Sequence, residues 1–251
     1  MRVIAHRGLA DDVPENTFAA LEAALAAGAD GLEVDVRATA DGVAVCCHDA
    51  DLRRVARLPL TVSQEEAARL CAVDLGLGQR IPRLADVLTL TSGRSELVLD
   101  LKADGTGPRR DAAALATCRE LQRLGSLEAV TVSSFDPRSL EVVAELVPQV
   151  RRALLTDDHL SASACLAETV ARGHQGAHPH VAALLAEPDL ADRAAARGVT
   201  VRTWTVNHAA TALTLAQRGV DAVITDRPRD LVSLLQSHRN GASHVATAPR
   251  A

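Results

Sequence analysis

The sequence is poor in aromatic side chains, with two Phe, one Trp and no Tyr among 251 residues. This scarcity excludes an aromatic platform on which single-stranded bases could stack, and an aromatic girdle at a bilayer surface. Basic residues are not in excess either, because 27 Lys and Arg stand against 32 Asp and Glu, a net charge of −5. We therefore expect no nucleic-acid partner. The core must be built from Leu, Val, Ile and Ala.

Long apolar runs are also missing. None approaches the roughly 18 residues of a membrane-spanning helix, and the opening segment Met1–Arg7 lacks the apolar stretch of a signal peptide. We expect no stable membrane insertion and a cytoplasmic location. The five cysteines contain no C-x-x-C pair, which disfavours a zinc ribbon or a disulfide framework and suits a reducing compartment.

Short aliphatic runs alternate with Ala- and Leu-rich amphipathic segments along the chain, a pattern typical of βα units around a parallel sheet. Eight strands are predicted, at Arg2–Ala5, Gly31–Val36, Leu97–Leu101, Ala129–Ser133, Val150–Leu155, near Gly176, Thr200–Trp204 and Ala222–Ile224. A further short strand, Val43–Cys47, is expected as a side ribbon. Eight such units in about 250 residues indicate an α/β fold, the (β/α)8 TIM barrel. We expect a single domain over residues 1–239, followed by a flexible tail over residues 240–251.

Helix boundaries are marked by capping residues. Asn16 or Thr17 can cap the first helix, and Gly28 is expected where the chain leaves it. Pro82 and Pro137 are expected to open two later helices, since proline is tolerated in the first turn.

Charged residues lie at the carboxyl ends of two predicted strands. Within Gly31–Val36 the period-two geometry puts Glu33 and Asp35 on one face, and Asp100 and Lys102 share a face in the same way. Taken alone, such a pair is more often a solvated polar face. A parallel barrel covers both faces, however, so inward carboxylates there need a compensating cation. We expect them to meet at the barrel mouth and to favour Ca²⁺ or Mg²⁺ over zinc.

Two histidines also follow strand-like runs, and each adjoins a charged residue: His6 precedes Arg7, and His48 precedes Asp49. A lone histidine is more often a packing or surface residue. Two of them beside a carboxylate cluster favour acid/base chemistry, while arginine offers a planar fork for phosphate oxygens. An anion site, a divalent cation and an acid/base pair together indicate phosphoester hydrolysis.

A series of motifs runs through nearly the whole chain, in the order His6-Arg7-Gly8, Pro14-Glu15-Asn16-Thr17, Glu33-Val34-Asp35-Val36, Asp41-Gly42 leading to His48-Asp49, Ile81-Pro82-Arg83-Leu84, Asp100-Leu101-Lys102, Ser134-Phe135, Trp204-Thr205-Val206-Asn207 and Ile224-Thr225-Asp226-Arg227-Pro228. In content, order and spacing the motifs resemble those of the glycerophosphodiester phosphodiesterases. The combination is far more specific than any one motif.

This resemblance implies a TIM barrel that hydrolyses a small-molecule glycerophosphodiester to glycerol 3-phosphate and an alcohol. Motif positions imply the site residues: the acid/base pair His6 and His48, the metal ligands Glu33, Asp35 and Asp100, the phosphate contacts Arg7 and Lys102, and the pocket residue Trp204. The family commonly carries Glu where this chain has Asp100. The shorter side chain leaves open whether this third ligand reaches the metal directly or through a water.

Three other readings compete. A two-metal amidohydrolase-like barrel would carry His-x-His after the first strand, where this chain has His6-Arg7. A non-catalytic phosphoester-binding barrel would have lost the histidines or the carboxylates. Lysophospholipase D-like activity on the same fold is disfavoured by the lack of an aromatic or amphipathic membrane-docking segment. The head group, the metal, the oligomeric state and the choice between direct water attack and a cyclic phosphate are left open.

Two further features are assigned no catalytic role. His174, His178 and His180 could mimic a metal site, but Pro179 and the absence of a carboxylate motif favour a solvated loop. Ser134 lacks the G-x-S-x-G turn of a hydrolase nucleophile, so we expect it in a turn or cap.

Overall fold

Eight parallel strands close into a barrel in the computed structural model, which describes residues 1–104, 107 and 109–246. The strands are β1 (Arg2–His6), β2 (Gly31–Ala38), β4 (Glu96–Leu101), β5 (Val130–Ser134), β6 (Arg151–Thr156), β7 (Gly176–Pro179), β8 (Thr200–Thr203) and β9 (Ala222–Thr225). The barrel closes because β1 pairs with both β9 and β2, so that Ile4 lies opposite Ile224 on one side and Gly31 on the other. The predicted TIM barrel is confirmed.

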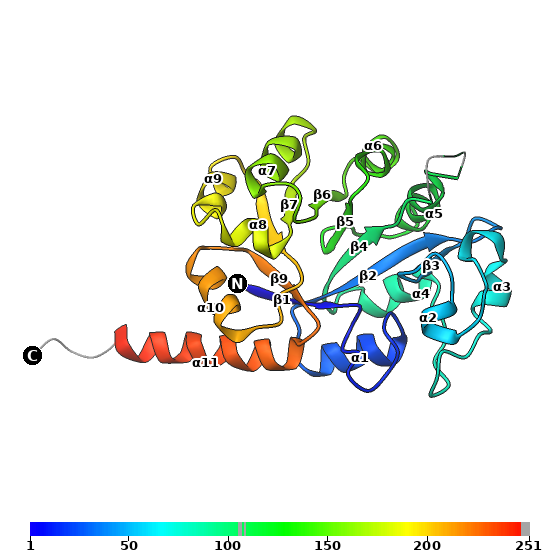
Figure 1. Cartoon of the computed structure of the whole chain (residues 1–251), viewed down its shortest axis with the longest axis horizontal. Coiled ribbons are helices and arrows are strands. Elements are labelled where there is room, and N and C mark those ends of the chain that lie inside the picture. Colours follow the sequence, from blue (N-terminus) through cyan, green and yellow to red (C-terminus); the bar gives the residue numbers. More distant parts are fainter. Residues whose placement is uncertain (105–106, 108, 247–251) are drawn as a thin grey trace, which may run out of the picture.

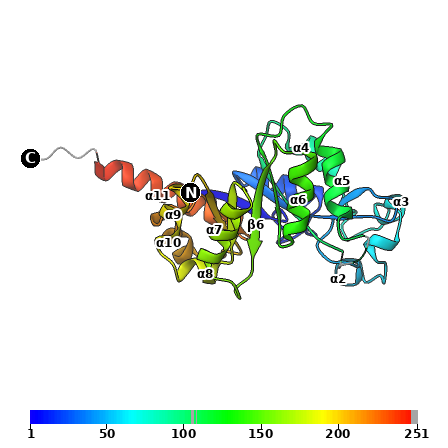
Figure 2. The same cartoon turned by 90° about the horizontal axis from the view of Figure 1, so that it is seen from above.

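Helices connect the strands and cover the outside of the barrel (Figures 1 and 2). They are α1 (Phe18–Ala26), α4 (Leu84–Thr91), α5 (Ala112–Leu121), α6 (Pro137–Leu146), α7 (Ala162–Ala171), α8 (Val181–Leu185), α9 (Leu190–Ala195), α10 (Ala209–Gln217) and α11 (Pro228–Ala246). Within the described ranges, none has the length and apolarity that a membrane crossing requires. Helix α11 runs past the boundary expected at residue 239, and residues 247–251 of the expected tail lie outside the described residues.

The capping predictions hold at two of three helices. Thr17 caps α1 by accepting a hydrogen bond from the Ala20 backbone N–H, and Gly28 leaves the helix at a φ of +84°. Pro137 is the first residue of α6. Pro82 does not open a helix, because its carbonyl accepts a hydrogen bond of 2.9 Å from the Cys46 backbone N–H and holds this segment extended, so α4 begins at Leu84.

The barrel is tightly packed around Gly31 and closed by ion pairs at its amino end. A Cβ atom on Gly31 would lie 2.7 Å from Ile4 Cδ1, so even a methyl group has no space there. At the amino end, Glu96 binds both Arg2 and the buried Arg202 and closes the floor with an ionic cluster. A ligand must therefore enter from the carboxyl ends of the strands, where such barrels place their sites.

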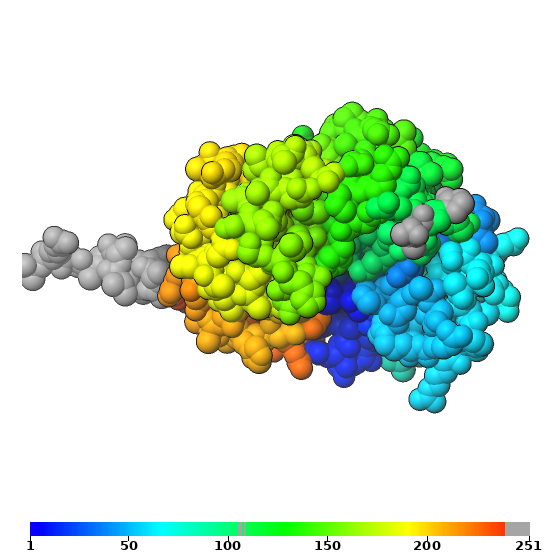
Figure 3. All heavy atoms as spheres, turned by 45° about the horizontal axis from the view of Figure 1, so that its top comes forward, coloured from blue at the N-terminus to red at the C-terminus, as the bar shows by residue number. Residues whose placement is uncertain are grey.

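Residues 39–83, between β2 and α4, form a separate lobe beside the barrel (light blue to cyan in Figure 3). This lobe contains β3 (Ala44–Cys46), α2 (Arg53–Ala56), a short 3-10 helix (Val62–Gln64) and α3 (Ala67–Leu70). Strand β3 runs antiparallel to β2, as expected of a side ribbon. The lobe has its own small aliphatic core and carries His48 to the barrel mouth.

Candidate active site

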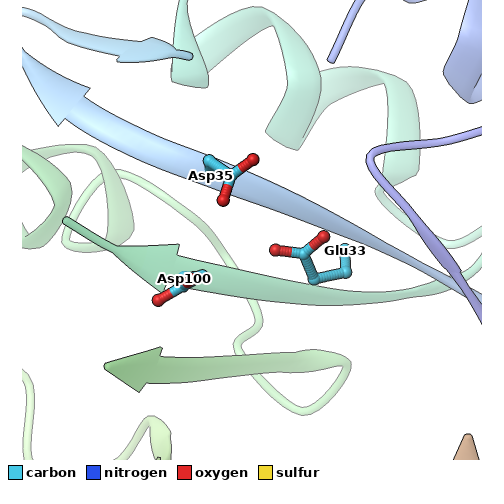
Figure 4. A group of neighbouring side chains, drawn as sticks. All are labelled: Glu33, Asp35 and Asp100. Carbon is cyan, nitrogen blue, oxygen red and sulfur yellow. The ribbon is translucent and has the colours of Figure 1, made fainter. Parts of the chain in front are cut away.

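Three buried carboxylates gather on neighbouring strands (Figure 4). Glu33 and Asp35 come from β2, and Asp100 lies opposite Asp35 on β4. One oxygen of each lies within 4.8 Å of the others. Burial, with the charge of Asp35 added, raises the pKa of Glu33 to about 8. Burial and Asp35 also raise the pKa of Asp100, more than Lys102 lowers it.

Two cationic side chains, Lys102 and Arg7, neutralise Asp35. Lys102 Nζ lies 2.9 Å from Asp35 Oδ1 and also binds Asp100, while Arg7 Nε lies 3.0 Å from Asp35 Oδ2. Burial alone would raise the pKa of Asp35, but the charges of Lys102 and Arg7 bring it to about 2. Asn16 Nδ2 donates a further hydrogen bond of 2.8 Å to Asp35. Asp35 is therefore ionised and held by three partners.

The cluster of three carboxylates, Glu33, Asp35 and Asp100, suits a divalent cation. Asp100 Oδ1 is buried and finds no hydrogen-bond partner among the described residues, and an orphaned oxygen of this kind is costly unless something binds it. Glu33 accepts one hydrogen bond of 3.1 Å, from the Arg7 backbone N–H. All the offered ligands are carboxylate oxygens, which Ca²⁺ and Mg²⁺ prefer. Asp100 reaches the group despite its short side chain, and direct ligation by it stays a prediction.

His6 lies at the end of β1 between two carboxylates. Its Nδ1 is 2.6 Å from Asp226 Oδ1, and its Nε2 is 4.0 Å from Glu33 Oε2. Burial lowers the pKa of His6, but the hydrogen bond to Asp226 and the charge of Glu33 outweigh burial and leave the pKa raised. Asn207 Nδ2 in turn donates to Asp226 Oδ2 at 2.8 Å. The imidazole is thus oriented with Nε2 toward the cluster of three carboxylates, on the side of Glu33.

His48 is held by a second network, which comes from the lobe. Its Nδ1 lies 2.8 Å from Asp49 Oδ1, and Asp49 Oδ2 accepts a hydrogen bond of 2.6 Å from Arg54 Nε. The other nitrogens of Arg54 bind Glu15, which also binds Arg7 at 3.1 Å. A chain of ionic contacts therefore joins His48 to Arg7, the predicted phosphate contact that directly follows β1.

Three positions in this region adopt the left-handed backbone conformation. The φ angles of Arg7 and Asn16 are 58° and 57°, which are unfavourable for residues with a Cβ atom. Both side chains are held by Asp35, which supplies compensating contacts. Gly8 has a φ of 87°, and a Cβ there would lie 2.5 Å from the carbonyl carbon of Ala20. The glycine after His6-Arg7 is therefore required by helix α1, which packs against it.

These groups surround a cavity of about 260 Å³ at the barrel mouth. Seven of the eight predicted site residues line it, and Asp35 lies beneath it at 1% exposure. Trp204 is anchored by its Nε1, which donates to the His178 carbonyl at 3.0 Å. Its ring stands edge-on to Phe135 at 5.3 Å between centroids. One wall of the cavity is charged and the other is aromatic and aliphatic.

Several residues of this site were not selected from the sequence. Phe135 and Asp226 lie within quoted motifs, and their position after strand ends could have selected them. Leu155 and Ile224 also line the cavity, but an aliphatic residue at a strand end carries no such signal. Arg54 lies in the lobe, where no strand pattern indicated its partners.

The expectation of a solvated histidine loop is wrong. His178 belongs to β7, is fully buried and has no hydrogen-bond partner for either ring nitrogen within the described structure. His174 is also buried, and His180 caps α8 by accepting from the Ala182 backbone N–H. Ser134 has the expected turn role, since its Oγ accepts a hydrogen bond from the Asp136 backbone N–H.

Comparisons with known proteins show which family the sequence resembles. The model of the glycerophosphoryl diester phosphodiesterase family matches residues 6–230. A glycerophosphodiester phosphodiesterase of Caldanaerobacter subterraneus subsp. tengcongensis is 29% identical over 241 residues, which cover 93% of this chain and 97% of the relative. One from Bacillus altitudinis is 28% identical over 240 residues, with the same coverage of 93% and 97%.

Solved structures agree with the sequence comparison. A phosphodiesterase of Oleispira antarctica, in complex with the product sn-glycerol-3-phosphate, superposes with a TM-score of 0.84 at 27% identity, covering 94% of this chain and 97% of its own. A glycerophosphodiester phosphodiesterase of Parabacteroides distasonis gives a TM-score of 0.83 at 27% identity, covering 95% and 98%. The family match runs from the end of β1 into α11 and so includes every strand end that contributes to the cavity. The chain therefore belongs to the glycerophosphoryl diester phosphodiesterase family.

Proposed function

We propose that the chain hydrolyses glycerophosphodiesters to glycerol 3-phosphate and an alcohol, with Ca²⁺ or Mg²⁺ held by Glu33, Asp35 and Asp100. One observation carries the proposal: three buried carboxylates, one with an orphaned oxygen, adjoin Lys102 and Arg7 at the wall of one cavity, which Glu33 and Asp100 line directly. The product bound to the Oleispira antarctica relative is consistent with this substrate class.

The charged wall suits a phosphate. A divalent cation bound there would polarise a phosphoryl oxygen and stabilise negative charge on it. Lys102 supplies a compact point charge and Arg7 a planar fork, and both face the cavity. Their attraction to phosphate grows as charge builds on its oxygens, which favours the transition state over the ground state.

The two histidines divide the proton transfers. Asp226 and Asp49 each occupy the Nδ1 of one imidazole, so Nε2 is the atom left for the substrate. The contacts of His6 with Asp226 and Glu33, which raise its pKa, favour its protonated form and suit it to donate a proton to the leaving oxygen. His48 takes a proton from the attacking oxygen, which belongs to water or to a hydroxyl group of the substrate's own glycerol. In the second case the leaving alcohol departs from a cyclic phosphate, which water then opens to glycerol 3-phosphate. Asp49 stabilises the imidazolium that results.

An assay of three substrates tests the reaction. The purified chain is incubated with glycerophosphocholine, glycerophosphoethanolamine and a lysophospholipid, with Ca²⁺ or Mg²⁺, and glycerol 3-phosphate is measured. We expect product from the first two and none from Glu33→Gln. The matched control is Glu22→Gln, a change at an exposed position of α1 that should leave turnover unchanged. A folded wild-type chain that releases no product with either cation contradicts the proposal.

The partners and location expected from the sequence stay predictions. We propose a small-molecule substrate as the main partner, no nucleic-acid partner and a cytoplasmic location. An excess of acidic over basic residues supports the second point.

A further inference from the structure

A second cavity, of about 410 Å³, adjoins the catalytic one. It lies over the end of β6, which helices α6 and α7 flank (Figure 1). We call it the side groove, and its apolar walls include Phe135, Pro137, Leu154, Leu155, Leu160 and Ala164. Phe135 and Leu155 also line the catalytic cavity, so the two spaces share a wall. Nothing in the reaction proposed above uses the side groove.

The chemistry of the side groove is apolar. Leu160 and Phe135 at its rim are 51% and 43% exposed, which leaves two large hydrophobic side chains in water beside an apolar space. Its two carboxylates already have partners, since Glu168 binds Arg172 at 2.6 Å and Asp157 accepts from the His159 backbone N–H. Among the described residues that line the groove, none is basic. It is therefore unsuited to a second phosphate.

Phe135 connects the groove to the charged wall of the active site. Lys102 Nζ lies 6.0 Å from the centroid of the Phe135 ring, and Trp204 stands edge-on to the same ring. A phosphodiester whose phosphate contacts Lys102 thus has one substituent next to Phe135. Phe135 also lines the side groove, so this substituent lies at the boundary between the two spaces.

We propose that the side groove binds a hydrocarbon chain attached to the phosphodiester substrate. The inference rests on the proposed function and extends it, because it names a substrate class whose leaving alcohol is alkyl rather than small and polar. The chain belongs to the leaving alcohol, since the proposed product, glycerol 3-phosphate, has an unsubstituted glycerol. Each methylene that leaves water for the groove should raise kcat/KM about fourfold at most.

Two substrate series test which end of the substrate carries the chain. The first varies the leaving alcohol of a glycerophosphodiester from methanol through n-butanol to n-octanol. The second compares glycerophosphocholine with its 1-butanoyl and 1-octanoyl esters. We expect kcat/KM to rise with chain length in the first series and not in the second. A flat profile in the first series, or a rise in the second alone, overturns the proposal.

Variants of the groove tie the effect to its walls. Ala164 is an exposed residue of α7, so Ala164→Phe should fill the groove without disturbing the core. We expect it to abolish the gain from chain length while leaving the methyl ester unaffected, and Leu160→Gln should reduce that gain. The control is Val170→Gln, on the same helix but outside the groove lining. A chain-length gain that survives Ala164→Phe overturns the assignment.

The charge preference of the groove is tested by an isosteric pair. Glycerophosphocholine and the glycerophosphodiester of 3,3-dimethylbutanol have the same shape, and only the first carries a positive charge. We expect the neutral ester to be hydrolysed at least as efficiently. A strong preference for choline would assign a cation to Asp157 and Glu168 and contradict the hydrocarbon assignment.

Binding measurements keep the inference separate from the proposed reaction. Calorimetry with Glu33→Gln measures the affinity of the methyl, butyl and octyl esters without turnover. An affinity that rises with length supports the groove even if wild-type chain hydrolyses none of these substrates, in which case only the proposed function fails. Affinities that do not rise, in a protein that hydrolyses the methyl ester, reject the groove alone.

Discussion

Arg54 donates hydrogen bonds to both carboxylate oxygens of Glu15, at 2.7 and 2.9 Å. Its remaining nitrogen, Nε, binds Asp49 at 2.6 Å. A residue of the lobe therefore orders the partners of Arg7 and His48 at the same time, although its own side chain is half exposed. Arg54 is a positioning residue, because it reaches the cavity only through these two carboxylates.

We expect Arg54→Ala to lower kcat about 10-fold to 100-fold, the usual range for residues that orient others. Arg54→Lys should restore little, since an ammonium group cannot bind Glu15 and Asp49 in this forked geometry. The measurements are kcat and KM for glycerophosphoethanolamine together with thermal melting. Arg53→Ala is the matched control, because Arg53 binds only the neighbouring Asp51 in the described structure. A loss of melting temperature with unchanged kcat would show that Arg54 acts on stability alone.

The contact between Asp226 and His6 predicts a change in pH dependence. The carboxylate stabilises the protonated imidazole, so Asp226→Asn should lower the pKa of His6. If His6 acts as the acid, activity falls as pH rises through that pKa, and the alkaline limb of the kcat/KM profile should move to lower pH. Asp230→Asn, at an exposed position of α11, provides the control. An alkaline limb that stays in place would show that another group controls it.

Replacing the imidazole itself has a larger effect. His6→Ala should reduce kcat by at least about 100-fold, because the acid is then lost.

Removal of the metal should abolish turnover. Without a cation the negative charges of Glu33, Asp35 and Asp100 repel one another, and after burial the charge of Asp35 is the next cause of the raised pKa of Glu33. Exhaustive chelation should eliminate the release of glycerol 3-phosphate, and added Ca²⁺ or Mg²⁺ should restore it. The added ion should also raise the melting temperature, because it binds the folded chain and not the unfolded one. Glu33→Gln should show neither response. Full activity after chelation would contradict the metal assignment.

A stability effect is expected far from the active site, at His174. Burial, together with the charges of Arg152 and Arg172, lowers the pKa of His174 to about 4. An unfolded chain protonates this side chain near its ordinary pKa of about 6.5, so it gains protons that the folded chain excludes. The stabilising contribution of neutral His174 is therefore complete above pH 6.5 and is lost as pH falls toward 4.

Melting temperatures measured from pH 7 to pH 4 check this effect. Wild-type chain should lose stability over the range more steeply than His174→Gln, whose side chain does not titrate. His159→Gln changes a histidine that is 87% exposed and should keep the wild-type slope. Equal slopes for wild type and His174→Gln would contradict the prediction.

The strand pattern predicted the cluster of three carboxylates because two simple rules apply to it. Alternation places Glu33 and Asp35 on one face, and parallel pairing then brings Asp100 opposite Asp35. The bounds of strand β7 could not be predicted, because its four residues include a buried histidine and a proline in place of an aliphatic run. The contacts of Arg54 could not be predicted, since they join loops whose approach is set by the tertiary fold.

Lys102 offers the sharpest test of how the active site works. It is the only lysine in the chain, its Nζ touches both Asp35 and Asp100, and their charges outweigh burial and raise its pKa. A compact ammonium fits between the two carboxylates and still faces the cavity, whereas a guanidinium plane is larger and would be crowded by Phe135. We therefore expect Lys102→Ala to lower kcat/KM by about 100-fold or more, the scale for removing one group that stabilises transition-state charge. Lys102→Arg should recover little of this loss.

A purely structural role for Lys102 makes a different prediction. If it only pairs with Asp35 and Asp100, Lys102→Ala should melt at a lower temperature and turn over normally once folded, and Lys102→Arg should restore much of the melting temperature. Measuring kcat/KM and thermal melting on the same preparations separates the two roles. A folded, inactive Lys102→Arg protein favours contact with the phosphate, because its charge is kept and only the shape of the cation has changed.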